Sequence, residues 1–331
     1  MRIGLTYDVQ TDPTDERQAE FDAPTLIQAL QDALTTLGHE VVRLGNAQHL
    51  LADRQRLAVI DLVFNLAEGS HGRNREAWVP MLLEQWGIPF VGSGSVAQAL
   101  GLDKLMSKRL ARASGVATPN WCVVERSDAF PQMHGLRFPL IVKPRYEGSG
   151  VGVDPGAIVH DVDSLRARVR WALDRFQQPC LIEEFIPFGE LTIFLIGNHP
   201  PEALPAIQRP LDPATRLSCH VVRRPESTAW LCPVDLTQEL DAAARALAVT
   251  MFEVLRCDDV ARVDLRVDED GTLYFLEINP LPSFDPAESL GLIAEYLGTP
   301  CTELVGRILD AALVRLQQSA SRQVANERMN E

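Results

Sequence analysis

Several features are missing from the sequence, and each absence excludes a class of protein. No apolar run approaches the ~18 residues of a membrane-spanning helix, and the opening Met-Arg-Ile-Gly-Leu-Thr-Tyr-Asp has no apolar leader segment. The six cysteines are widely scattered and show neither C-x-x-C metal spacing nor a dense disulfide framework. We therefore expect a soluble, cytoplasmic protein with reduced thiols and no membrane partner.

Positive charge is also scarce. The chain has 31 lysines and arginines against 45 aspartates and glutamates, which gives a net charge of −14. Such a surface repels phosphate backbones, so we expect no nucleic-acid partner. The only lysines are Lys104, Lys108 and Lys143.

What is present fits a globular protein of two or three lobes, because 331 residues exceed what a single core usually serves. Residues 1–100 alternate strand-like segments (2–7, 41–44, 62–66 and 88–91) with helical ones, such as the helix from Pro24 to Gly38. This alternation predicts an α/β lobe built on a parallel sheet.

The character changes after residue 100. Helices are expected at 104–113, where Asp103 can cap the first turn, and at 162–176 and 236–255, with strands at 121–124, 138–143, 181–185 and 191–196. These segments predict two α+β lobes, over residues 101–186 and 187–316. The polar residues 317–331 are expected to form a frayed, flexible tail.

A hairpin at residues 260–279 gathers oxygen ligands. If Asp270-Gly271 forms a two-residue turn, Asp264 faces Glu277 and Arg262 faces Asn279, all on one side. Two carboxylates and an amide suit magnesium that carries phosphates. The opposite face would hold Val263, Leu265, Leu276 and Ile278. The alternative is an ordinary solvated face on which Arg262 only pairs with Asp264.

A strand ending at Lys143 leads into Gly148-Ser149-Gly150-Val151-Gly152. Glycines let backbone N–H groups approach phosphate oxygens closely, although a plain turn is the alternative. Lys104 occupies the first turn of its helix, where the helix dipole disfavours a cation. Some other interaction would explain its position, and an exposed solubilising lysine is the alternative.

Together these segments resemble the ATP-grasp superfamily, and within it the D-alanine:D-alanine ligase branch. The resemblance rests on Phe90-Val-Gly-Ser-Gly, Leu102-Asp-Lys-Leu-Met-Ser-Lys108, Ile141-Val-Lys-Pro144 with the glycine loop, Leu181-Ile-Glu-Glu184, and Arg262-Val-Asp264 with Glu277-Ile-Asn279. It implies an N-terminal parallel α/β lobe and two α+β lobes that sandwich ATP.

The resemblance also implies roles for individual residues. Those expected at ATP are Lys104, Lys143, the flap Gly148, Ser149, Gly150, Val151 and Gly152, the hinge Glu183, Glu184, Phe185 and Ile186, and Glu190 and Phe275. Asp264, Glu277 and Asn279 would hold two Mg²⁺ ions, which Mn²⁺ can replace. Arg262, Ser149 and Ser283 are the catalytic candidates.

The substrate region departs from the family pattern. The loop after the first strand lacks the family's Gly-Gly segment, so Glu16 and Glu20 are only candidates for its substrate-binding glutamate, with plain surface acids as the alternative. Further candidates are Glu68, Arg73, Glu76, Arg223, Arg224 and Ser289. The loop 220–233 has no lysine or tyrosine where the family has both.

We therefore predict an ATP-dependent carboxylate–amine ligase that forms an amide through an acyl phosphate, with an amino acid substrate other than the D-alanine pair. The alternatives are an authentic D-alanine:D-alanine ligase of cell-wall synthesis and a non-catalytic ATP-binding regulatory module. The partners would be a small-molecule carboxylate and amine, and homodimerisation is a family expectation.

Overall fold

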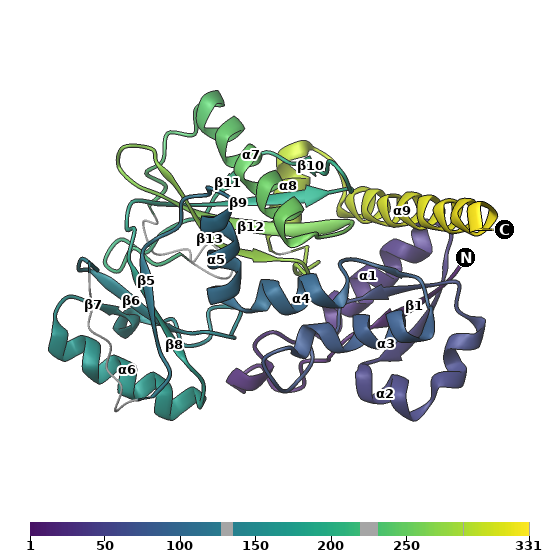
Figure 1. The fold of residues 1–331 in the computed structure, drawn as a ribbon, viewed down its shortest axis with the longest axis horizontal. Helices are drawn as coiled ribbons and strands as arrows, with labels where there is room; N and C mark the ends of the chain where they lie inside the picture. Colours follow the sequence, from purple (N-terminus) through teal and green to yellow (C-terminus); the bar gives the residue numbers. More distant parts are fainter. Residues whose placement is uncertain (127–134, 219–230, 287, 331) are drawn as a thin grey trace.

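The N-terminal lobe is a parallel sheet, as the alternating pattern predicts (Figure 1). The computed structural model describes residues 1–126, 135–218, 231–286 and 288–330, the stretch 322–330 only as backbone. The sheet has the order β2-β1-β3-β4, and every neighbouring pair is parallel. Its strands are β1 (Arg2–Thr6), β2 (Glu40–Gly45), β3 (Leu62–Asn65) and β4 (Phe90–Val91).

Helices of this lobe begin and end at residues that favour those positions. Pro24 supplies the fixed φ of a first helical turn, and Gly87 takes the left-handed conformation (φ 66°) that ends a helix. The helical segments are α1 (Pro24–Thr36), α2 (Ala47–Ala52), α3 (Trp78–Trp86), α4 (Ser95–Leu102) and the short 3₁₀ turns at Glu16–Gln18, Arg54–Val59 and Arg75–Ala77.

The central lobe is an antiparallel sheet of order β5-β8-β6-β7. Its elements are β5 (Trp121–Val124), β6 (Leu140–Pro144), the 3₁₀ turn Pro155–Ala157, β7 (Ile158–Val159), α6 (Val162–Phe176) and β8 (Cys180–Glu184). Leu165 and Val169 of α6 pack against Val142 and Ile182 of the sheet. One helix therefore covers one face of this sheet.

The third sheet carries the predicted hairpin. It has the order β10-β9-β12-β13, with β11 also paired to β9. Its elements are β9 (Gly189–Ile196), β10 (Glu202–Ala203), β11 (Ile207–Gln208), α7 (Gln238–Leu255), β12 (Val260–Val267) and β13 (Leu273–Asn279).

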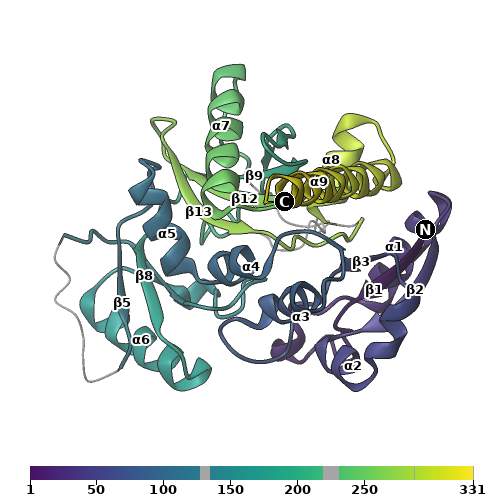
Figure 2. The same ribbon diagram turned by 45° about the vertical axis from the view of Figure 1, so that its right-hand side comes forward.

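Chain order and packing do not coincide at the lobe boundaries. Ala97 of α4 and Ala111 of α5 (Lys104–Ala113) belong to the hydrophobic core of the third sheet, although the sequence assigns them to the first and second lobes. Figure 2 shows α4 between the N-terminal lobe and the two antiparallel sheets. The lobe limits at 100, 186 and 316 stay predictions.

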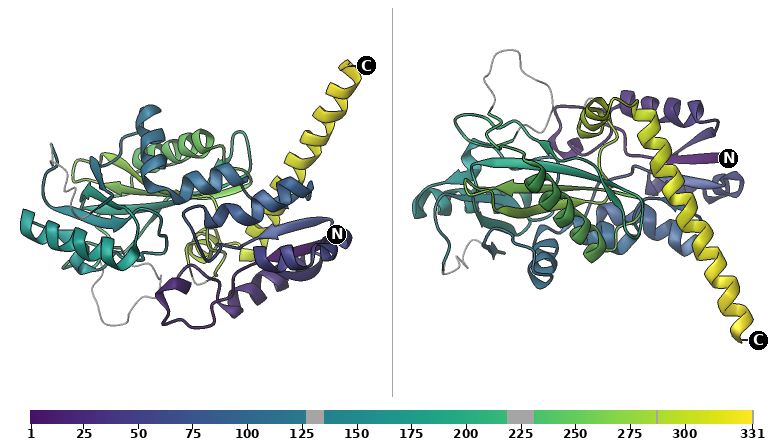
Figure 3. Two further views of the ribbon diagram at one scale, coloured as in Figure 1. Left: turned by 60° about the horizontal axis from the view of Figure 1, so that its bottom comes forward. Right: turned by 90° about the horizontal axis from the view of Figure 1, so that it is seen from above.

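The C-terminal helices return to the N-terminal lobe. Ile293 of α8 (Ser289–Leu297) and Ile308 of α9 (Cys301–Asn330) share a core with Leu30 of α1. The frayed tail expected from residue 317 is replaced by helix, whose end projects from the body of the protein (Figure 3). No glycine or proline interrupts this stretch, and Ser319 and Ser321 donate hydroxyl hydrogen bonds to carbonyls one turn earlier. Within the described residues, no helix has the length and apolarity to cross a membrane.

Candidate active site

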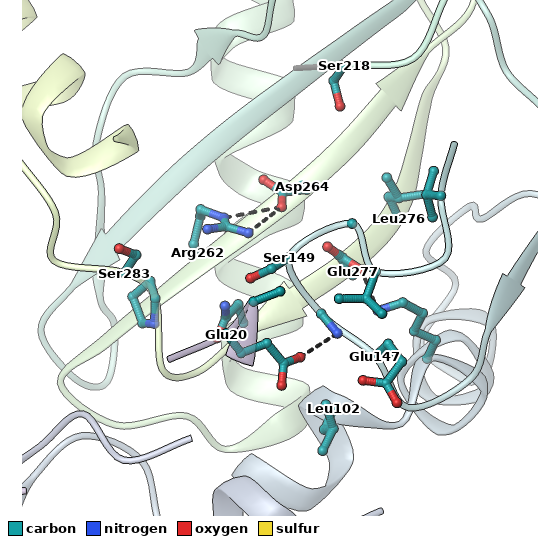
Figure 4. A pocket seen from close by; sticks show the side chains of 18 of the residues that line it. Glu20, Leu102, Glu147, Ser149, Ser218, Arg262, Asp264, Leu276, Glu277 and Ser283 are labelled. Atoms are coloured by element: carbon teal, nitrogen blue, oxygen red, sulfur yellow. Dashed lines mark hydrogen bonds and ion pairs between the residues drawn. The ribbon is translucent and has the colours of Figure 1, made fainter. Parts of the chain in front are cut away.

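A cavity of about 500 Å³ is lined by residues from all three lobes. Figure 4 shows the hairpin side chains Arg262, Asp264 and Glu277 on one side of it and the glycine loop with Ser149 facing them. Glu20, Glu147 and Leu102 lie at one end, and Ser218 lies at the other. The residues that chemistry needs are far apart in sequence, so the fold brings them together.

The hairpin has the predicted register at the four polar residues of the proposed metal site. Arg262 faces Asn279 and Asp264 faces Glu277. The turn itself was predicted wrongly, because it spans residues 268–272, closed by hydrogen bonds between Asp268 and Thr272 and between Asp268 and Gly271. A register shift between Asp264 and Leu265 compensates for the longer turn.

This bulge corrects two predictions. Leu276 was expected in the core and Phe275 at the nucleotide, but Phe275 is 0% exposed in the core of the third sheet. Leu276 lines the cavity in its place. The bulge leaves Leu276 without a facing partner and turns Phe275 inward, where its N–H donates to the Ala117 carbonyl.

Arg262 pairs with Asp264 in this structure, as the simpler reading of the hairpin expected. Its Nε and one terminal nitrogen lie 3.2 and 3.0 Å from Asp264 Oδ2. The other oxygen, Asp264 Oδ1, accepts a hydrogen bond from Thr192. Burial opposes the charge on Arg262, but Asp264 and Glu277 outweigh it and raise the pKa of the guanidinium. The arginine is therefore a fixed cation at the cavity wall.

Lys104 is buried and paired with a carboxylate, so the exposed-lysine alternative is wrong. Its Nζ lies 2.9 Å from Glu277 Oε2, and its side chain is only 10% exposed. Asp103 caps the helix by accepting from the N–H groups of Leu105 and Met106. Burial opposes ionisation of Glu277, but Lys104 and then Lys143 outweigh it and hold its pKa far below the ordinary range. Glu277 is therefore anionic at any working pH.

Lys143 and Glu183 form a second buried pair, with Nζ and Oε2 2.5 Å apart on neighbouring strands. Sequence reasoning missed the third member. Lys108 is 0% exposed, lies 2.7 Å from Glu183 Oε1 and donates to Thr118. Burial lowers the pKa of Lys108 to about 8. Its spacing of four residues from Lys104, one helical turn, was the available signal.

The predicted hinge residues Glu184, Phe185 and Ile186, and Glu190, also line the cavity. Glu184 accepts from Asn120 and Arg137. Glu190 is paired with Arg266 at 2.9 Å and lies 3.6 Å from Arg209. Its carboxylate is therefore held between two arginines.

The glycine loop lies over the cavity and is tied to the N-terminal lobe. Gly148, Ser149, Gly150 and Val151 line the cavity, and Ser149 adopts a left-handed φ of 46°. The N–H of Gly148 donates to Glu20 Oε1 at 2.6 Å. Gly152 does not line the cavity, since its Cα packs beside Pro144 and Phe176.

Arg75 organises this end of the cavity, and sequence reasoning chose Arg73 instead. Arg75 binds Glu20 through two nitrogens at 2.5–2.8 Å, donates to the Tyr146 carbonyl at 2.8 Å and lies 3.3 Å from Glu147. Arg73 is exposed and outside the cavity lining. Two arginines two residues apart in a loop cannot be told apart without the backbone.

The other substrate candidates divide into three groups. Glu20, Glu68, Glu76 and Ser289 line the cavity, as does the catalytic candidate Ser283. Glu16 does not, because it pairs with Arg175 on the surface at 2.7 Å. Arg223 and Arg224 lie outside the described residues.

The donor set of the hairpin suits a hard cation. Asp264, Glu277 and Asn279 offer carboxylate and amide oxygens on facing positions of two strands, and all three line the cavity. Asn279 Oδ1 accepts only the local N–H of Leu281 at 2.9 Å among the described contacts. Over the described ranges, no three His, Cys, Asp or Glu side chains converge as a metal site. A metal here therefore needs the amide and ligand oxygens to complete its shell.

A parallel α/β lobe followed by two antiparallel sheets around one shared cavity is the architecture of the ATP-grasp class. A family model described as D-ala D-ala ligase C-terminus matches residues 110–310. The crystal structure of a D-alanine–D-alanine ligase from Bacillus anthracis complexed with ATP is similar, with a TM-score of 0.77, 25% identity, and coverage of 96% of this chain and 99% of that one.

Two relatives are similar in sequence. An uncharacterized protein, y4sG, of Sinorhizobium fredii is 33% identical over 304 residues, 88% of this chain and 87% of that protein. A D-alanine–D-alanine ligase of Alcanivorax borkumensis is 35% identical over 246 residues, 74% and 76% of the two chains. The chain belongs to the D-alanine–D-alanine ligase family of ATP-dependent carbon–nitrogen ligases.

Proposed function

We propose that this protein binds ATP and joins a small-molecule carboxylate to an amine through an acyl phosphate, with an amino acid substrate other than the D-alanine pair. The observation that carries the proposal is the convergence of Lys104, Lys143 and Arg262 with the oxygen ligands Asp264, Glu277 and Asn279 on one cavity under the glycine loop. Three cations and a hard-oxygen site match the needs of phosphoryl transfer.

The chemistry divides one uphill step into two. A carboxylate oxygen of the substrate attacks the γ-phosphorus of ATP, and the bond from that phosphorus to the β–γ bridging oxygen breaks, releasing ADP. The amine nitrogen then attacks the acyl carbon, and the tetrahedral intermediate expels phosphate while the amine loses a proton. Direct condensation would have to expel hydroxide, a poor leaving group.

Residues of the chain supply the charge that each step requires. Lys104 and Lys143 are held by Glu277 and Glu183, so they are oriented before ATP arrives. Arg262 is oriented by Asp264 to offset negative charge on the transferred phosphoryl group and the tetrahedral oxyanion. Ser149 and Ser283 line the same cavity, where the Ser149 hydroxyl and a backbone N–H near Ser283 would help to stabilise the oxyanion.

Asp264, Glu277 and Asn279 would hold the magnesium or manganese, which would neutralise phosphate charge. Glu277 is paired with Lys104, and Asp264 is paired with Arg262. A bound metal would compete with these two cations for the carboxylates. The closed glycine loop would keep water away from the acyl phosphate.

The test is ATP hydrolysis to ADP and phosphate in the presence of Mg²⁺ and a panel of amino acids and carboxylates, with products identified by mass spectrometry. An amide product that requires ATP is expected. Nucleotide binding without phosphate release with any substrate would favour the non-catalytic module and overturn the proposal.

A D-alanine–D-alanine ligase is the second candidate, because relatives of that name are 33–35% identical over 74–87% of this chain. D-alanine alone with ATP separates the two. Formation of D-alanyl-D-alanine as the main product would favour this candidate over an alternative amino acid. Homodimerisation and a cytoplasmic location stay predictions.

A further inference from the structure

The N-terminal end of the cavity holds more carboxyl groups than the neighbouring cationic side chains pair with. Four carboxylates line it: Glu20, Asp22, Glu68 and Glu76. Only Glu20 has an ion-pair partner among the described residues, and that partner, Arg75, is already bound to Tyr146 and Glu147 as well.

Two of these carboxylates are enclosed and unpartnered. Glu76 is 6% exposed, and its side chain forms no hydrogen bond or ion pair with the rest of the described chain. Asp22 is 9% exposed, and its Oδ2 has no hydrogen-bond partner in the part of the chain that the structure covers. An enclosed carboxyl without a partner costs free energy, so each position is poised for a ligand group.

The acids act on one another. Burial, and then Glu76, Glu20 and Asp22, raise the pKa of Glu68 well above its usual range. Burial and then Glu20 raise the pKa of Glu76 to about 8, although Arg75 and Lys104 oppose this. Glu68, which is half-buried, and Glu76, which is buried, line the same end of the cavity, and a cation there would relieve this repulsion.

The neighbouring cations are already paired with other carboxylates. Lys104 is held by Glu277 at 2.9 Å and Arg75 by Glu20 at 2.5 Å. In the described ranges, this end of the cavity included, no three His, Cys, Asp or Glu side chains converge as a metal site. An organic ammonium does not need three converging acids, so it suits this end of the cavity better than a metal ion.

The walls beside the acids are apolar. Leu66, 3% exposed, lies two residues before Glu68, and Leu102, 4% exposed, ends α4, which packs on the Arg75–Ala77 turn. Both leucines line the cavity, and Figure 4 shows Leu102 at the same end as Glu20. An aliphatic stem would bury its methylenes there while its charged end reaches the acids.

We infer that the substrate seated at this end is a diamino acid, an amino acid whose aliphatic side chain carries a second amine held by Glu68 and Glu76. This inference rests on the proposed ligase function and names the class of one substrate. The α-ammonium of any amino acid offsets one carboxylate. Glu68, Glu76 and Asp22 have no ion-pair partner in the described part of the chain, so a second ammonium would find carboxyl acceptors at this end of the cavity.

The inference is tested by ADP release from ATP and Mg²⁺ with neutral amino acids (alanine, serine) and diamino acids (lysine, ornithine, 2,4-diaminobutyrate), in both stereochemistries. We expect kcat/KM to be at least ~10-fold higher for a diamino acid, since a buried charged contact is worth 1.4 kcal/mol or more. Equal or greater values for neutral amino acids would overturn it.

Variants assign the effect to the site. Glu76→Gln and Glu68→Gln keep the side-chain shape and remove the charge. Each should lower kcat/KM for the diamino acid at least ~10-fold more than for a neutral amino acid, mainly through KM. Glu40→Gln is the matched control, because Glu40 is an exposed acid on β2 that pairs with Arg2 of β1. It should leave kcat/KM for both substrate types unchanged. Equal losses for both substrate types would contradict the assignment.

Binding gives a readout that does not need turnover. Titration calorimetry of the diamino acid with a non-hydrolysable ATP analogue, in two buffers of different ionisation enthalpy at pH 7, should show proton release, because the bound ammonium lowers the pKa of a carboxyl that is protonated beforehand. Glu76→Gln should abolish most of it. Binding without any proton release refutes the inference, whereas binding without turnover by any substrate refutes only the ligase proposal.

Discussion

Arg75→Ala should release the glycine loop from the N-terminal lobe. Arg75 connects three parts of the molecule: it binds Glu20, which accepts the Gly148 N–H, and it contacts the Tyr146 carbonyl and Glu147 at the base of the loop. Without it Glu20 and Glu147 face each other across the same space with no cation between them. The hydrogen bond to Gly148 then loses its fixed acceptor.

The magnitude follows from burial. The side chains of Arg75 and Glu20 are 8% and 10% exposed, so this is a buried pair. Removing one partner of such a pair costs about 3–5 kcal/mol. A decrease of about 3 kcal/mol in the free energy of local opening would make the loop amides exchange roughly 100-fold faster, because each 1.4 kcal/mol is a factor of ten in the opening equilibrium.

Hydrogen–deuterium exchange of the full chain without ligand is the assay, followed in peptides that cover residues 146–153. Arg75→Lys keeps the charge but loses the planar fork, so its effect should lie between wild type and alanine. Arg175→Ala is the matched control. It breaks an arginine–glutamate pair at a similar distance, 2.7 Å, but with 57% and 40% exposure, and such pairs contribute only about 0–1 kcal/mol.

The reasoning is refuted if Arg75→Ala leaves exchange of residues 146–153 unchanged, or if Arg175→Ala accelerates it equally. Exchange in α7 provides the check on global unfolding, since that helix packs in another core. Faster exchange in both regions would mean that Arg75 stabilises the whole fold and does not act specifically on the loop.

Three further perturbations test other parts of the site. Burial raises the pKa of Glu76 from 4.5 to about 8, so the folded state keeps a proton that the unfolded state loses. The free energy of unfolding should therefore fall by up to about 1.4 kcal/mol per pH unit as the pH rises between these values. Thermal melts of Glu76→Gln should lack this dependence on pH. Lys108→Ala should lower the free energy of unfolding in urea by about 3–5 kcal/mol, because Glu183 loses a buried partner. The double variant Lys108→Met with Glu183→Gln should recover part of this loss. Equal losses in Lys108→Ala and the double variant would contradict the pairing. Chelation of divalent metal should weaken ATP binding, and Asp264→Asn should raise the Mg²⁺ concentration needed for it at least ~10-fold; metal-independent affinity would argue against the hairpin site.

Local signals in the sequence predicted most of the elements and one half of the site. Helices α5 and α6 have the predicted bounds, and Asp103 caps α5. The hairpin pairs Arg262 with Asn279 and Asp264 with Glu277 because strand side chains alternate with period two. That prediction held although the turn was wrong, since the bulge restored the register.

The bulge was beyond local reasoning. Whether Phe275 or Leu276 faces the core depends on where the backbone of Phe275 binds Ala117 and Thr118, which come from a different part of the chain. The fully buried position takes the larger aromatic side chain. A period-two pattern carries no information about such a distant wall.

Loop residues show the same limit more strongly. Glu16 and Glu20, or Arg73 and Arg75, are equivalent as letters in a polar segment, yet one of each pair lies on the surface and the other beside the cavity. Irregular backbone has no periodicity that fixes side-chain direction. Choosing between them requires the positions of Tyr146 and Glu147, some 70 residues away.

The sequence by itself determined the secondary elements, the ordered motifs and the chemistry of the hairpin, since these depend on neighbours within a turn or along one strand pair. Only the tertiary structure decided which buried charges meet: Lys104 with Glu277, Lys108 with Glu183, and Arg75 with Glu20. It also left Glu76 enclosed without a partner. Desolvation and charge pairing act between segments that only folding brings together.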